Sequence, residues 1–68
     1  METYKIAILD YQRNEVVILE VEWSLLERFW DGNIEKYVFA DKKIGGLGYG
    51  SDQIEYMVSS KLKVRMNL

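Results

Sequence analysis

The sequence predicts a small α+β domain, in which one or two helices pack on one face of an antiparallel sheet built from an N-terminal hairpin and C-terminal strands. Residues 3–11 and 15–22 are two strand-like apolar segments on either side of a short polar turn. Residues 23–41 place apolar side chains at helical spacing. Residues 61–66 alternate strictly between cationic and apolar side chains, as a half-buried strand does. At 68 residues, the chain is expected to form one domain, residues 1–68.

The hairpin is expected to turn at Arg13 and Asn14, so that Tyr11 lies opposite Val16 and Lys5 opposite Glu22. Side chains alternate between the two faces of a strand. One face then carries Tyr4, Ile6, Ile8, Val17, Leu19 and Val21 and is the expected core. The other carries Ala7, Leu9, Tyr11, Val16 and Ile18. This second apolar face is the candidate interface with another protein, unless residues 47–54 fold over it.

Residues 23–41 are expected to form two short helices, although one long helix fits the same spacing. Ser24 and Glu27 have the spacing of a capping box at the start of the first helix. Gly32 is a plausible end of that helix, and Asn33 a plausible cap for the second.

The remainder contains a glycine-rich segment and two candidate strands. Residues 45–50 include four glycines, but they match neither the dinucleotide nor the Walker phosphate motif, so a flexible connection is the favoured interpretation over an anion site. Residues 51–59 fit a helical turn or a strand, and the strand is favoured because Tyr-Met-Val suits a pleated surface. Residues 61–66 predict a final strand with Leu62, Val64 and Met66 inward.

Composition narrows the classes of function. The chain has no cysteine and no histidine, which excludes disulfides, Cys/His zinc sites and thiol or histidine catalysis. The carboxylate pairs Glu20/Glu22 and Glu27/Asp31 look like solvated faces, so we expect no catalytic residues, no cofactor and no metal. With neither a signal peptide nor a membrane-spanning segment in the sequence, the expected location is the cytoplasm.

A basic stripe supports an alternative function. Residues 1–41 carry a net charge of −5 and residues 42–68 a net charge of +3. Lys61, Lys63 and Arg65, with Tyr56 or Tyr49 as a stacking aromatic, would suit weak binding of nucleic acid. The whole chain is acidic, with a net charge of −2, so the favoured interpretation is that these cations face Glu20 and Glu22 across the sheet or simply solubilise it.

Two short pieces of the sequence also carry a resemblance. Asp10-Tyr11 before the turn and Glu15-Val16-Val17 after it, together with residues 54–59, resemble small uncharacterised bacterial proteins that are often associated with mobile elements. The resemblance implies a small stand-alone α+β protein without known activity, and it carries no functional residues onto this chain.

The sequence therefore predicts a non-catalytic protein-interaction module that binds another protein or itself, with a homodimer as the expected assembly. Ala7, Leu9, Tyr11, Val16 and Ile18 are its candidate interface.

Overall fold

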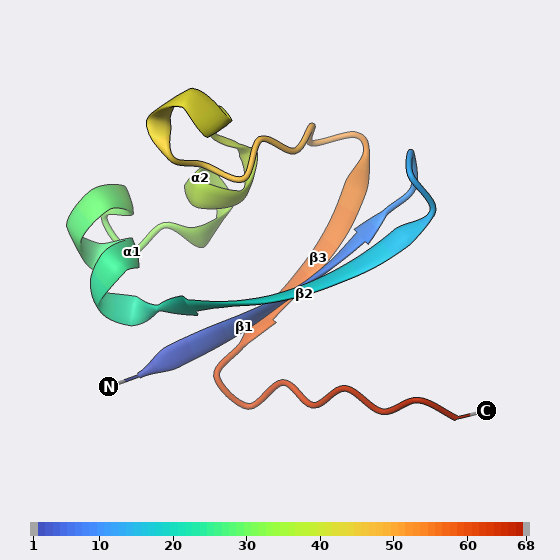
Figure 1. Ribbon diagram of the computed structural model, residues 1–68. Helices are drawn as coiled ribbons and strands as arrows, with labels where there is room; N and C mark the ends of the chain where they lie inside the picture. Colours follow the sequence, from blue (N-terminus) through green and yellow to red (C-terminus); the bar gives the residue numbers. More distant parts are fainter. Residues whose placement is uncertain (1, 68) are drawn as a thin grey trace.

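The fold is a three-stranded antiparallel sheet with two helices, which is the small α+β class that the sequence predicts with one strand fewer than expected. It was obtained as a computed structural model that describes residues 2–67 (Figure 1). The elements are β1 (Thr3–Asp10), β2 (Glu15–Glu22), α1 (Trp23–Trp30), α2 (Ile34–Phe39), the 3-10 helix η1 (Lys42–Ile44) and β3 (Ile54–Ser59). The strand order is β2-β1-β3, so β2 and β3 are the two edges. The small α+β class is confirmed.

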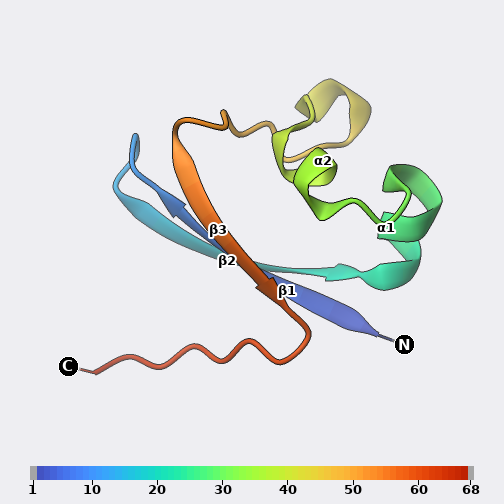
Figure 2. The ribbon, with the colours of Figure 1, turned by 180° about the vertical axis from the view of Figure 1, so that it is seen from behind.

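The sheet has one covered side. Both helices, η1 and the connection to β3 lie on one side of it, whereas residues 60–67 run along the other side, back toward the β1–β2 turn (Figures 1 and 2). The connection through residues 47–53 therefore covers the helical side, and the prediction that it could fold over the second hairpin face is wrong.

The hairpin forms with a register two residues away from the predicted one. Leu9 lies opposite Val16 and Lys5 opposite Glu20, because the loop is four residues long, from Tyr11 to Asn14. The Asp10 carboxylate accepts hydrogen bonds from the backbone N–H groups of Gln12 and Arg13, at 3.0 and 3.1 Å, which starts the turn directly after Asp10. A shift of two residues keeps every side chain on its face, so the division into two faces survives the error.

The core lies between the sheet and the helices. It consists of the buried side chains Ile6, Ile8, Val21, Leu26, Val38 and Ile54. Aromatic residues close its margins: Tyr4 packs on Trp23 with ring centroids 5.3 Å apart, and Trp30 packs on Tyr37 at 5.7 Å. All the hairpin positions predicted to face the core do so.

The first helix begins differently from its prediction. Its cap residue is Glu22, without a side-chain cap, and the Ser24/Glu27 capping box does not form. The Glu27 carboxylate accepts a hydrogen bond from the indole Nε1 of Trp23 at 2.6 Å instead. Because β2 runs straight into the helix, Ser24 lies inside the first turn, where it cannot cap it.

The second helix begins as predicted. The Asn33 side chain accepts a hydrogen bond from the backbone N–H of Lys36 at 3.0 Å, as expected of an N-cap. Asp31 ends the first helix in the left-handed conformation, and Gly32 after it also has a positive φ. Two short helices, not one long helix, are therefore present.

The C-terminal segment corrects one prediction. Residues 54–59 form β3, which confirms the strand, but residues 61–67 pair with no strand and are not part of the sheet. Of the three residues predicted to face inward, Leu62 is half-buried, whereas Val64 and Met66 are 60% and 77% exposed. We call residues 60–67 the tail.

The side-chain pattern of the tail explains why the tail does not fold back to form a hairpin with β3. The tightest turn would use Ser60 and Lys61 and would place Leu62 opposite Ser59. Lys63 would then lie opposite Val58 and point into the helical layer, where burial of an unpaired ammonium group is costly.

Candidate functional site

The candidate site is the sheet face that the helices leave uncovered. We call it the open face, and its apolar members are Ala7, Leu9, Tyr11, Val16, Ile18 and Met57. The central strand β1 brings them together: Leu9 lies opposite Val16 on one side, and Ala7 lies between Ile18 and Met57.

The apolar side chains of the open face are accessible. Leu9 and Ile18 are 42% and 41% exposed, and Val16 and Met57 are 65% and 56% exposed. Single exposed apolar residues are ordinary on a protein surface, but a contiguous group on three neighbouring strands is typical of an interaction site. The structure therefore brings together all five predicted interface residues, with Tyr11 at the turn, and adds Met57.

Tyr11 extends the site at the turn. Its backbone N–H donates to the carbonyl of Gln53 at 3.0 Å, which fixes the turn beside the start of β3. Tyr11, Leu9 and Val16 line a hollow of about 250 Å³ at this end of the sheet. A hollow of this kind can receive a side chain from a docked surface.

The Tyr11 hydroxyl has a raised pKa. Desolvation is the main cause, and the nearby negative charge of Glu55 adds to it. Both effects favour the neutral phenol, so Tyr11 keeps its proton to a higher pH than a free tyrosine.

The opposite end of the same face is charged. Lys5 lies between Glu20 of β2 and Ser59 of β3, and Thr3 lies opposite Glu22. The face thus has a mainly acidic half near the start of β1 and a mainly apolar half near the turn, where Glu55 of β3 lies opposite Leu9.

The glycine-rich connection does not present free backbone donors to an anion. The backbone N–H groups of residues 45–49 donate to the carbonyls of Lys42, Asp41, Tyr37, Ala40 and Val38, and that of Gly50 donates to the side chain of Gln53. An anion cradle needs such groups unpaired. The geometry supports the interpretation of this segment as a structural connection.

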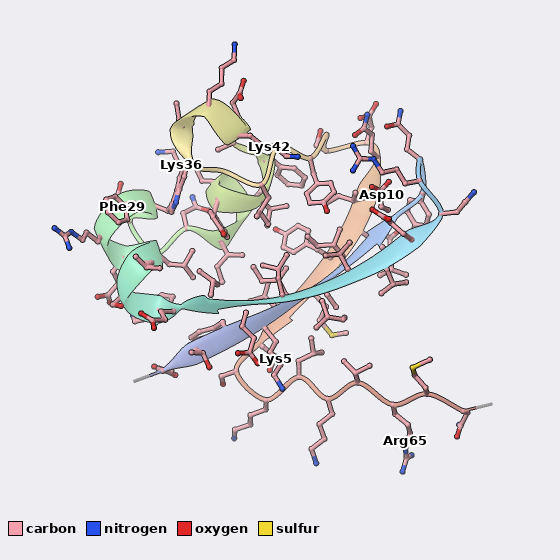
Figure 3. All side chains as sticks on the ribbon, viewed as in Figure 1. Lys5, Asp10, Phe29, Lys36, Lys42 and Arg65 are labelled. Atoms are coloured by element: carbon pink, nitrogen blue, oxygen red, sulfur yellow. The ribbon has the colours of Figure 1, made fainter. Side chains whose placement is uncertain are left out.

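The residues of the nucleic-acid alternative do not meet. Tyr56 is half-buried on the helical side of the sheet, where its ring packs edge-on against Phe39 with centroids 5.8 Å apart. Lys61, Lys63 and Arg65 belong to the tail on the other side, and Arg65 points away from the sheet (Figure 3). Tyr49 also packs against the core. Phosphate-binding cations without a stacking aromatic beside them are a weaker site for single strands.

Sequence reasoning omitted Met57, although its signal was present. If Ile54, Tyr56 and Val58 of β3 face the helices, Met57 must face the other way. What the sequence did not reveal is that β3 pairs with β1 and so sets Met57 beside Ala7.

Within residues 2–67, no cluster of three or more acidic, histidine or cysteine side chains is placed to hold a metal ion. None of the helices there is long and apolar enough to cross a lipid bilayer.

Comparison of the chain with protein-family models, curated proteins and solved structures gave no match. The resemblance to small bacterial proteins stays a prediction.

Proposed function

We propose that the protein is a non-catalytic interaction module whose open face binds a second copy of the same chain. The observation that carries the proposal is the contiguous exposed apolar group on all three strands, on the side of the sheet without helices. Burial of such a group stabilises an assembly by roughly 25 cal/mol per Å² of apolar area, before the cost of association.

The shape of the chain supports this proposal. The described residues measure 39 × 27 × 14 Å, with a radius of gyration of 12.3 Å, whereas a compact domain of this length has about 11 Å. One sheet with one helical layer leaves the second face of the sheet free. A second copy against the open face would cover it, with the two sheets about 10 Å apart.

The test is the solution mass of the purified chain over a concentration series, measured by light scattering. We expect twice the chain mass of 8.0 kDa at high concentration. The double substitution Leu9→Glu and Ile18→Glu is expected to give a monomer, because it places charges in the centre of the open face.

A matched control lies on the helical layer. Leu25 and Phe29 are 46% and 63% exposed, so Leu25→Glu with Phe29→Glu makes the same chemical change away from the open face. This control is expected to stay dimeric. A wild-type monomer at all concentrations, or equal loss of the dimer in both variants, contradicts the proposal. Circular dichroism confirms that each variant is folded.

A further inference from the structure

The tail has the pattern of a strand but no strand partner. It is extended, and alternation places Leu62, Val64 and Met66 on the side opposite Lys61, Lys63 and Arg65. Among residues 2–67, no backbone hydrogen bond joins residues 62–67 to the sheet, and the Lys61 N–H donates only to the Ser59 hydroxyl. An extended segment of this kind is suited to pair with the free edge of another sheet.

The edge strand β2 carries the complementary pattern. Its side chains alternate between Val17, Leu19 and Val21 on the helical side and Ile18, Glu20 and Glu22 on the open side. In an antiparallel pairing that sets Lys63 opposite Glu20, Lys61 lies opposite Glu22. The same register sets the tail's three apolar residues opposite the three apolar residues of β2. One register therefore pairs two of the three cations with carboxylates and all three apolar residues with one another, and it sets Arg65 opposite Ile18.

The other edge and the other direction fit less well. In an antiparallel pairing with β3, the tail's three apolar residues can lie opposite Val58, Tyr56 and Ile54. This register gives one opposite-charge pair, Arg65 with Glu55, and sets Lys63 opposite Met57. A parallel pairing with β2 that keeps the apolar match also gives one opposite-charge pair, Arg65 with Glu20. Charge therefore selects the antiparallel pairing with β2.

The size of the open face points the same way. Two strands of eight residues and one of six, at about 3.3 Å a residue and about 4.8 Å a strand, give a face of about 350 Å² in projection. A stable interface buries roughly 800 Å² on each partner. The tail lies on the side from which a second copy would approach (Figures 1 and 2), and its transfer would enlarge the interface.

We infer that each tail pairs with β2 of a second copy, with Lys61 and Lys63 opposite Glu22 and Glu20, so that two chains exchange their C-terminal strands. This inference rests on the proposed self-association and identifies the segment that completes it. Each sheet of the dimer then has four strands, the fourth supplied by the other chain.

Charge reversal tests the pairing. Lys61→Glu with Lys63→Glu is expected to weaken the dimer about tenfold or more, because two attractive pairs per tail become repulsive. Glu20→Lys with Glu22→Lys is expected to do the same. The chain with all four substitutions should regain the wild-type dimer dissociation constant to within about threefold, a difference of about 0.7 kcal/mol.

A matched control uses cations on the helical layer. Lys42→Glu with Lys43→Glu makes the same change of charge in the exposed helix η1 and should leave the dimer unchanged. If the tail variant behaves like this control while the open-face variant still dissociates, strand exchange is wrong and the proposed function stands. If the wild-type chain is a monomer, both proposals fail together.

Disulfide formation tests the register, since the chain has no cysteine of its own. A mixture of the Lys63→Cys and Glu20→Cys chains should form a mixed disulfide dimer under mild oxidation. A mixture of Lys63→Cys with Met57→Cys, the position opposite residue 63 in the alternative pairing with β3, should form far less. Equal yields, or a higher yield with β3, overturn the assignment to β2.

Discussion

At the scale of single residues, side-chain hydrogen bonds explain most differences between the expected and observed local structure. Asp10 determines where the hairpin turns, and Asn33 caps the second helix, while Glu27 bonds to Trp23 and takes no part in a cap. The Asn33 cap could be predicted because it needs only neighbours in sequence. The role of Asp10 could not, because several polar residues around the turn compete to define it.

The first prediction concerns Asp10, which is 5% exposed and accepts two backbone hydrogen bonds. Asp10→Ala is expected to lower the free energy of unfolding by about 2 kcal/mol, since two part-buried hydrogen bonds from backbone N–H groups to a carboxylate are lost. Asp10→Asn keeps an acceptor oxygen and should cost less. Urea denaturation measures both, and equal stability of the alanine variant and the wild type would refute this role.

The second prediction concerns the ionisation of tyrosine. Desolvation raises the pKa of Tyr11 and of Tyr56, and the charges of Glu55 and Glu35 respectively add to the rise. Glu55→Gln is therefore expected to lower the pKa of Tyr11 and to leave that of Tyr56 unchanged. Glu35→Gln should have the reverse effect, so each variant is the control for the other.

The sign of the pH dependence follows from these shifts. A tyrosine whose folded pKa is raised binds its proton more tightly when folded. Its contribution to stability is complete below the unfolded pKa of about 10 and is lost as pH rises through the folded value. NMR titration of the ring carbons between pH 8 and 12 measures both midpoints, and an unmoved Tyr11 midpoint in Glu55→Gln would count against the assignment.

At the scale of elements, the glycine-rich connection is shaped by close packing. A Cβ atom at Gly46 would clash with the backbone oxygen of Ala40, and Gly45 and Gly48 have positive φ angles. The sequence indicated a connection, but the close approach depends on where the second helix ends, and no local pattern reveals that.

The tail illustrates the same limit. Its alternation predicted a strand. A strand pairs stably only where its apolar side chains lie on the covered face of the sheet, and the tightest turn after β3 would place Lys63 there instead.

The third prediction follows from this packing. Gly46→Ala is expected to destabilise the fold by about 2 kcal/mol or more, because the methyl group meets backbone that cannot move aside cheaply. Gly50→Ala is the comparison, since its Cβ would meet the flexible side chain of Gln53 at 2.9 Å. Thermal unfolding should rank Gly46→Ala well below Gly50→Ala, and equal midpoints would contradict the packing argument.

At the scale of the whole molecule, the fold class and both faces of the hairpin could be predicted because they depend on periodicity alone. The register error of two residues did not affect them. The face that the helices cover could also be predicted, because it is the more continuously apolar one: it carries Tyr4, Ile6, Ile8, Val17, Leu19 and Val21. The position of β3 beside β1, and hence the full open face, required long-range pairing that a single sequence does not encode locally.

Substitutions in the open face and in the tail both alter how two chains meet. The central claim is that the open face is buried against a second copy. Substitution reports on this indirectly, through the mass of the particle. Contacts between the two chains report on it directly.

The most direct measurement is an isotope-filtered NOE experiment on a mixture of labelled and unlabelled chain. We predict contacts between chains from the methyl groups of Leu9, Val16, Ile18 and Met57. Leu25 and Ile44, exposed on the helical layer, serve as internal controls and should show none. Contacts that arise only from the helical layer, or no contacts between chains at any concentration, would contradict the account.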